Sequence, residues 1–171
     1  VMQLENLEQI VQQAVLLQLV AHPDIEFALD LANESLIIDC DSRQLGQCLT
    51  NLLQNAAEAI EGREENSPGV DEKGKIIVKV RSQNGKNVIE IEDNGPGLPV
   101  ENRDRLTEPY VTTRARGTGL GLAIVSKIME DHVGEFILSD RSGGGALAVL
   151  RFSAARPDEF TDDVKEIDAG S

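Results

Sequence analysis

Two asparagines, Asn51 and Asn55, lie four residues apart in a segment with helical periodicity. They belong to a set of polar residues at steps of three and four, which would share one face of a helix: Gln44, Gln47, Asn51, Asn55 and Glu58. Asparagine is a poor helix former, so two of them in mid-helix suggest a role beyond solvation. An amide oxygen is a suitable ligand for Mg²⁺, with phosphates and water completing the octahedron. The alternative is that both side chains simply face water.

A second candidate site begins at Asp93, where an alternating strand pattern ends. Gly95 and Gly97 follow, separated by a proline, and predict a tight turn where backbone can approach a flat ligand closely. A carboxylate at the end of a strand can accept a hydrogen bond from an exocyclic amine such as that of adenine. The alternative is an ordinary Asp-Asn-Gly turn.

A third candidate is the glycine run Gly117, Gly119 and Gly121, which leads into a helical pattern over 119–132. Backbone N–H groups and the positive end of the helix dipole would suit a phosphate there. The G-x-G-x-G spacing differs from the dinucleotide-binding pattern G-x-G-x-x-G. The alternative reading is a flexible loop with glycines that allow close helix packing.

Charge is unevenly distributed along the 171 residues, whose formal net charge is −14. Four arginines nevertheless crowd into the stretch before the glycine run: Arg103, Arg105, Arg114 and Arg116. In so acidic a chain this cluster suggests a small anionic ligand, although a solvated loop is the plainer reading. The negative surface argues against nucleic-acid binding and against direct membrane contact.

The elements that must position these residues follow from periodicity and turn signals. Helices are predicted over 4–20, 42–60 and 119–132. Strands are predicted over 25–31, 36–40, 75–82, 87–92, 135–140 and 146–153. Hairpin turns are predicted at 32–35, at Asn84-Gly85 and at Gly143-Gly144-Gly145, a capping box at Asp41, and a helix end at Gly134.

This order of elements predicts an α+β fold, a two-layer sandwich in which about three helices cover one face of a mixed, mostly antiparallel sheet. Aromatic residues make up only 3% of the chain, so the core should be aliphatic. We expect one domain over residues 1–155 and a flexible acidic tail over 156–171. The chain reads as a piece of a longer protein.

In combination and in this order, the motifs over residues 4–153 resemble the catalytic ATP-binding domain of bacterial sensor histidine kinases. That family belongs to the GHKL superfamily, with gyrase B, Hsp90 and MutL, whose fold is called the Bergerat fold. The resemblance is carried by an N box at 47–57, a G1 box at 93–97, a G2 box at 117–121 and a last glycine box at 143–146. The stretch 108–113 is similar to the nitrogen-regulation kinases of the NtrY and NtrB type.

The resemblance implies a role for each site residue. Asn55 would be the Mg²⁺ ligand, Asn51 would lie beside the phosphates, and Asp93 would accept the adenine amine in a pocket shaped by Gly95 and Gly97. Residues 108–119 would form a mobile lid over the nucleotide. The nucleotide-binding and catalytic residues implied for the lid and the glycine run are Tyr110, Thr113, Arg114, Arg116, Gly117, Thr118, Gly119, Leu120 and Gly121.

Three departures from the family pattern also carry information. Many relatives have a lysine where this chain has Glu58, and the usual phenylalanine before the glycine run is Tyr110. Hydrolytic members of the superfamily carry a glutamate base where this chain has Asn51. The loss of that base argues against an efficient stand-alone ATPase.

The resemblance implies that the domain binds ATP with Mg²⁺ and passes the γ-phosphoryl group to a histidine on a dimerisation domain. His22 and His132 both lie in contexts typical of structural histidines, so the acceptor is expected on a segment outside this chain. A response regulator would be the downstream partner. The location would be cytoplasmic, compatible with a parent kinase anchored in the inner membrane. Alternatives are a serine/threonine kinase of the anti-sigma-factor type and a non-catalytic nucleotide-binding module.

Overall fold

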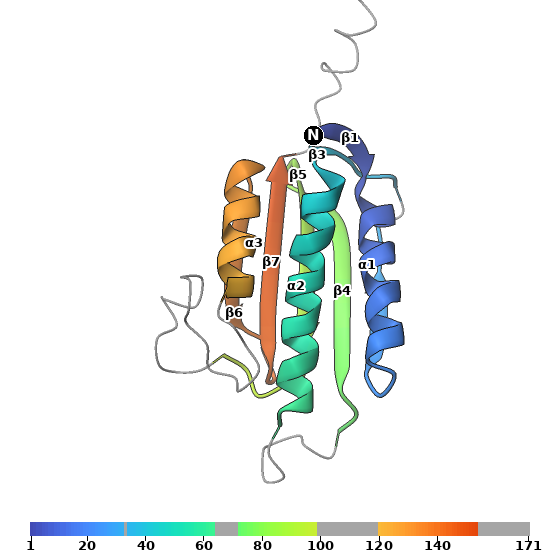
Figure 1. The fold of residues 1–171 in the computed structure, drawn as a ribbon, viewed down its shortest axis with the longest axis vertical. Coiled ribbons are helices and arrows are strands. Elements are labelled where there is room, and N and C mark those ends of the chain that lie inside the picture. Colours follow the sequence, from blue (N-terminus) through green and yellow to red (C-terminus); the bar gives the residue numbers. More distant parts are fainter. Residues whose placement is uncertain (33, 64–71, 99–119, 154–171) are drawn as a thin grey trace, which may run out of the picture.

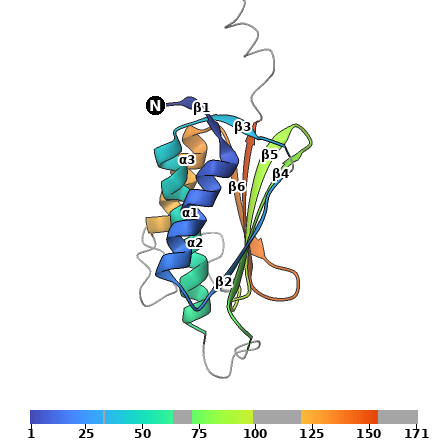
Figure 2. The same ribbon diagram turned by 90° about the vertical axis from the view of Figure 1, so that its right-hand side faces the viewer.

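A computed structural model of the chain describes residues 1–32, 34–63, 72–98 and 120–153. It is a two-layer sandwich, with helices on one face of a sheet (Figures 1 and 2). The helices are α1 (Leu7–Ala21), α2 (Ser42–Glu61) and α3 (Leu120–Asp131). The strands are β1 (Gln3–Asn6), β2 (Glu26–Asp30), β3 (Ile37–Cys40), β4 (Lys75–Gln83), β5 (Lys86–Asp93), β6 (Glu135–Asp140) and β7 (Ala146–Ser153).

The main sheet has five strands in the order β2-β4-β5-β7-β6. Its β2–β4 pair is parallel and its other pairs are antiparallel, as expected for a mixed, mostly antiparallel sheet. The β4–β5 hairpin closes through Asn84 (φ 55°) and Gly85 (φ 76°), the two positive φ angles that this tight turn requires. The predicted hairpin between β6 and β7 also forms, across three glycines with positive φ.

The hairpin predicted between 25–31 and 36–40 is wrong. Strand β2 pairs with β4, and β3 pairs instead with β1 in a separate two-stranded sheet at one end of the sandwich (Figure 1). The first predicted helix correspondingly begins later, because residues 3–6 are extended. Asn6 caps α1, since its side chain accepts a hydrogen bond from the Gln9 N–H at 3.2 Å.

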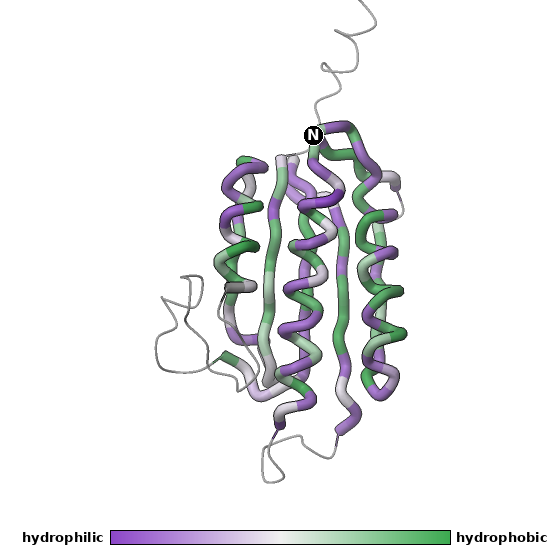
Figure 3. The backbone as a smooth tube through the Cα atoms, viewed as in Figure 1, coloured by the Kyte–Doolittle hydropathy of each residue, from purple (hydrophilic) through white to green (hydrophobic). Residues whose placement is uncertain are grey.

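The core is aliphatic, as the composition predicts, and hydrophobic residues run along the strands that build it (Figure 3). Helix α2 contributes Leu45, Leu49 and Leu53, and strand β4 contributes Ile76 and Val78, all almost fully buried. Each such side chain stabilises the fold by about 1.5–3 kcal/mol relative to remaining exposed. The core therefore fixes α2 against the centre of the sheet.

Two free cysteines, Cys40 on β3 and Cys48 on α2, are completely buried. Burial raises the pKa of the Cys48 thiol to about 12. The pKa of Cys40 is raised to about 11, first by burial and then by the nearby carboxylates of Glu5, Asp39 and Asp41. Both side chains are thus held as neutral thiols inside the fold.

Helix α3 ends close to the predicted point but with a different residue in the left-handed conformation. That residue is Val133 (φ 53°), while Gly134 follows it and donates its N–H to the Met129 carbonyl at 2.9 Å. Gly134 is needed for packing, because a Cβ there would lie 2.6 Å from the Arg151 carbonyl oxygen. None of the described helices is long and apolar enough to cross a membrane.

Candidate active site

Helix α2 carries both asparagines on its half-buried polar face, and α3 begins beside one of them. A Cβ built on Gly121, in the first turn of α3, would lie 4.0 Å from the Asn55 Nδ2 atom. Asn51 lies one turn earlier on the same face of α2. The fold therefore brings an amide side chain to the N-terminal turn of a helix, where backbone N–H groups and the dipole favour anions.

The end of β5 supplies a buried carboxylate. Asp93 is only 6% exposed, and its Oδ1 atom accepts hydrogen bonds from the N–H groups of Gly95 at 2.9 Å and Ala146 at 3.4 Å. A Cβ on Gly95 would lie 3.2 Å from the Cβ of Ala59, which is one turn beyond Asn55 on α2. Asp93 and Asn55 therefore lie at the same end of the sandwich.

The turn between β6 and β7 supports the loop that follows Asp93. Gly145 (φ 103°) lies so close to this loop that a Cβ would come within 1.8 Å of the Asp93 carbonyl oxygen. Gly97 (φ 88°) meets the same turn, and the Leu98 N–H donates to Asp140 Oδ1 at 3.2 Å. The loop is held in place by a hairpin about fifty residues away in the sequence.

The sequence analysis did not predict the supporting role of three residues that hold this loop. Asn94 accepts from the Lys75 N–H at 2.8 Å and donates to the Lys73 carbonyl at 2.9 Å, which ties the loop to the start of β4. Asp140 and Gly145 act from the β6–β7 turn. The available signal was the row of three glycines before β7, because adjacent glycines indicate positive φ and close approach of backbones.

Several predicted site residues lie outside the described part of the chain: Tyr110, Thr113, Arg114, Arg116, Gly117, Thr118 and Gly119. Arg103, Arg105 and the tail over 156–171 lie outside it as well. Leu120 is the first residue of α3. The described site thus consists of the Asn51–Asn55 face of α2, the loop after Asp93 and the start of α3.

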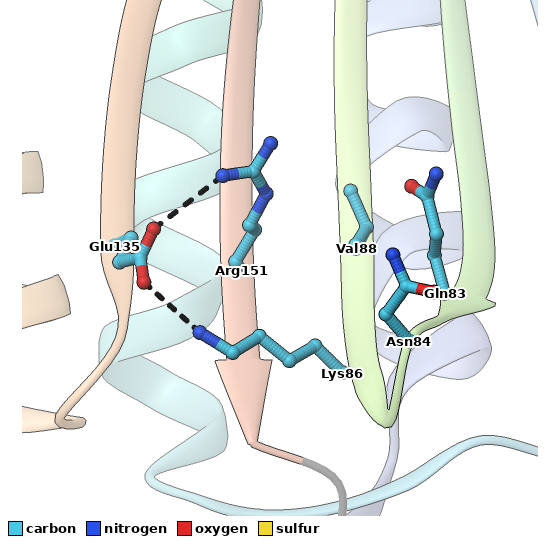
Figure 4. A pocket seen from close by; sticks show the side chains of 6 residues that line it. All are labelled: Gln83, Asn84, Lys86, Val88, Glu135 and Arg151. Carbon is cyan, nitrogen blue, oxygen red and sulfur yellow. Dashed lines mark hydrogen bonds and ion pairs between the residues drawn. The ribbon is translucent and has the colours of Figure 1, made fainter.

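A surface pocket lies at the opposite end of β5, where that strand begins (Figure 4). It is lined by Gln83, Asn84, Lys86, Val88, Glu135 and Arg151. Glu135 contacts Lys86 at 3.0 Å and Arg151 at 3.4 Å, and the bond from Lys86 is the main reason that the pKa of Glu135 is lowered. No predicted site residue lines this pocket, so it is separate from the candidate active site.

Comparison with known families decides the identity of the fold. Residues 40–156 match the model of the family described as histidine kinase-, DNA gyrase B- and HSP90-like ATPase. The chain belongs to this family. Within it, the chain is similar to the catalytic domains of sensor histidine kinases, including those named NtrY or NtrY-like. The resemblance seen in the sequence and the α+β sandwich of the Bergerat type are both confirmed.

Two curated relatives support this placement. The chain is 46% identical to the nitrogen regulation protein NtrY of Azorhizobium caulinodans over 90% of its own length and 20% of the relative. It is 39% identical to a putative NtrY-like sensor histidine kinase of Rickettsia conorii, over 75% of the chain and 18% of that relative. The chain therefore spans about a fifth of the length of these proteins.

Solved structures of histidine kinases have the same fold. The nucleotide-free catalytic domain of ThkA matches with a TM-score of 0.75 and 28% identity, over 91% of this chain and 99% of that one. ThkA was also solved in complex with the response regulator TrrA. The chain from that complex matches at a TM-score of 0.71 and 26% identity, over 90% of this chain and 42% of that one. Full-length ShkA in complex with AMPPNP matches at a TM-score of 0.71 and 25% identity, over 90% of this chain and 32% of that one.

Proposed function

We propose that this domain binds ATP with Mg²⁺ and transfers the γ-phosphoryl group to a histidine on a dimerisation domain of the longer kinase. The observation that carries the proposal is that Asn55 lies beside the first turn of α3, at the end of the sandwich where Asp93 is buried. This arrangement offers a base-recognising carboxylate and a phosphate-favouring helix terminus in one site. The ShkA structure with AMPPNP supports a nucleotide as the ligand.

Asp93 is proposed to select adenine. Two backbone N–H groups donate hydrogen bonds to one of its carboxylate oxygens, so the side chain is held in a defined orientation. A carboxylate accepts a hydrogen bond from the exocyclic amine of adenine, whereas guanine presents a carbonyl oxygen at the corresponding position. Two acceptors that face each other repel, and the site should therefore prefer ATP to GTP.

Asn55 is proposed to hold Mg²⁺, with Asn51 beside the phosphates. Amide oxygens are hard ligands that suit this cation, which usually takes only one or two protein ligands in addition to phosphates and water. Across the described ranges, no group of three or more His, Cys, Asp or Glu residues could hold a metal by itself. The cation would neutralise charge on the phosphates. Asn51 cannot remove a proton from water, which favours phosphoryl transfer over hydrolysis.

The remaining binding residues are proposed from the family motifs. Gly117, Gly119 and Gly121 would offer backbone N–H groups to the phosphates, and Arg114 and Arg116 would add positive charge. Tyr110, Thr113, Thr118 and Leu120 would line the nucleotide. These assignments extend the described start of α3 into the segment that precedes it.

The phosphoacceptor is proposed to lie elsewhere in the kinase, because both histidines of this chain have contacts within the domain. His22 pairs with Glu61 and His132 bonds to backbone groups of Asp41 and Ile128. A response regulator would receive the phosphoryl group, by analogy with the ThkA–TrrA complex. We propose that the domain lies on the cytoplasmic side of a kinase anchored in the inner membrane, with its own boundary at residue 155.

Calorimetric titration with ATP and GTP, with and without Mg²⁺, tests the binding site. Asp93→Asn should weaken ATP binding about tenfold or more and remove the preference over GTP, since a charge-assisted hydrogen bond is lost. Asn55→Ala should remove the dependence on Mg²⁺. The matched controls are Asp39→Asn and Gln54→Ala, two exposed positions that should change neither property. Equal wild-type affinities for ATP and GTP would contradict the role of Asp93.

Transfer is tested by adding a purified dimerisation segment and ATP labelled in its γ-phosphate. We expect an acid-labile label on that segment, because phosphohistidine hydrolyses in acid. An acid-stable label would indicate a serine/threonine kinase instead. Tight ATP binding without any transfer would indicate a non-catalytic nucleotide-binding module.

A further inference from the structure

The far end of α3 is tied to α2 through the imidazole of His132. Its Nε2 atom receives the backbone N–H of Asp41 at 3.1 Å, and its Nδ1 atom lies 2.7 Å from the Ile128 carbonyl oxygen. A backbone N–H can only donate and a carbonyl can only accept, so Nδ1 carries the proton and the ring is neutral. The ring also packs edge-on against Phe152, with ring centroids 6.3 Å apart.

This hydrogen bond takes the place of one that the sequence predicts within α2. Asp41 caps the helix, and its side chain accepts from the N–H groups of Arg43 and Gln44, as expected. In a complete capping box, the Gln44 side chain would receive the Asp41 N–H. That N–H donates instead to His132, so the start of α2 is joined to the end of α3.

The same two helices meet again at the candidate active site. Because Asp41 at the start of α2 is hydrogen-bonded to the end of α3, while Asn55 lies beside Gly121 at the start of α3, the helices run in opposite directions. Helix α3 has 12 residues and is therefore about 18 Å long. Its buried side chains, which include Val125, Ile128 and Met129, give non-directional apolar contacts, which resist separation better than sliding. A directional hydrogen bond fixes the axial position.

We propose that His132 is a positioning residue that sets the axial placement of α3 against α2, and through it the placement of Gly121 beside Asn55. The consequence for phosphate binding rests on the function proposed above. His132 touches no substrate. It acts by holding the helix whose first turn faces the phosphates, whereas the adenine pocket around Asp93 is held separately by the β6–β7 turn.

Three substitutions separate this role from general stability. His132→Gln retains an acceptor at about the depth of Nε2, whereas His132→Asn is too short to reach the Asp41 N–H, and His132→Phe retains the ring contact with Phe152 alone. His22→Asn is the matched control, because the hydrogen-bond partners of His22 are Gln18, Ile25 and Glu61, all of them outside α3. Circular dichroism confirms that each variant is folded before it is used.

The first measurement is made without nucleotide, by recording backbone amide resonances in labelled protein. We expect the Gly121 amide resonance to shift in His132→Asn and His132→Phe, and to return towards its wild-type position in His132→Gln. The imidazole nitrogens of the wild type should show a protonated Nδ1. An unmoved Gly121 resonance in both disruptive variants would overturn the proposal, whatever the domain binds.

The second measurement compares the affinities of MgATP and of adenosine, which lacks phosphates. Loss of one hydrogen bond predicts that His132→Asn weakens MgATP roughly two- to tenfold and leaves adenosine unchanged. An equal loss for both ligands would mean that His132 only stabilises the domain. If the wild type binds neither ligand, the proposed function fails, while the shift of Gly121 still decides the positioning role.

Discussion

At the scale of single residues, the fold treats two buried polar side chains in opposite ways. The Asp93 carboxylate receives two backbone N–H donors. Gln18 on α1 is 3% exposed, and its Oε1 atom finds no hydrogen-bond donor among the described residues. A buried acceptor without a donor costs about 1–3 kcal/mol. Asp93 is therefore held in one orientation, whereas Gln18 is a local weakness of the core.

Replacing Gln18 by methionine should stabilise the domain. Methionine has a similar length, favours helix and has no acceptor to desolvate, so we expect the free energy of unfolding to rise by about 1–2 kcal/mol. Urea denaturation followed by circular dichroism measures the change. Gln13→Met, at an exposed position of the same helix, should have almost no effect. A lower stability of Gln18→Met would show that the Gln18 amide has a favourable role in the core.

The sequence predicts where the candidate site residues with strong local spacing lie, but not which residues hold them in place. Asn51 and Asn55 share a helix face by their spacing alone, and Asp93 is marked by the end of a strand pattern. The contribution of Gly145 depends on a hairpin that packs against Asp93 from 52 residues away in the chain. No local pattern contains that contact. His132 was predicted to be structural, while its partner Asp41 depends on the packing of two helices.

At the scale of elements, the end of α3 combines an unfavourable residue with a necessary glycine. Val133 adopts a left-handed conformation (φ 53°) and is 87% exposed, so its side chain gains little packing for the strain of a β-branched residue there. Gly134, in contrast, is where a Cβ would collide with the Arg151 carbonyl oxygen. The glycine that the pattern identifies as the helix end thus serves packing, and the strained position lies one residue earlier.

We therefore predict that Val133→Gly stabilises the domain by about 0.5–1 kcal/mol, after the greater freedom of glycine in the unfolded chain is included. Thermal denaturation should show a correspondingly higher midpoint. Gly134→Ala is the informative counterpart and should destabilise, because backbone or Met129 must move to admit the methyl group. If Val133→Gly lowered stability, the strain assigned to this residue would be wrong.

Local signals predicted most elements but not how the early strands pair. The Asn84-Gly85 turn determines the β4–β5 hairpin within a few residues, and helix α2 follows from its periodicity and its Asp41 cap. The strands over 26–30 and 37–40 are both present, yet each pairs elsewhere. Strand β2 pairs with the edge of β4, and β3 pairs with the short β1. The helical pattern over 4–20 gave no sign of β1.

At the scale of the whole molecule, the first forty residues complete the two layers. Strand β2 covers the edge of β4, and α1 packs against α2 through buried residues that include Leu7, Val11 and Val15. The part of the chain that matches the family model begins only at residue 40. The family match therefore omits one strand of the main sheet and one of the three helices described above.

A chain shortened to residues 40–156 should consequently associate with itself. It would leave the nine-residue strand β4 as an open edge and would expose the apolar side of α2 that α1 covers. Light scattering should detect oligomers or aggregates, while a chain of residues 1–155 prepared in parallel stays monomeric. A monomeric shortened chain with cooperative unfolding would show that the early elements are dispensable for the fold.

Because Cys40 and Cys48 are buried, they can serve as natural probes of transient local unfolding. An alkylating reagent attacks the thiolate, and burial with a raised pKa keeps both thiolates scarce and shielded in the closed state. The rate of labelling at each cysteine therefore reports how often the surrounding structure opens. Cys40 reports separation of the β1–β3 pair and Cys48 reports exposure of α2 itself. The ratio of the two labelling rates, measured by mass spectrometry, shows whether the β1–β3 sheet opens more often than the main sandwich.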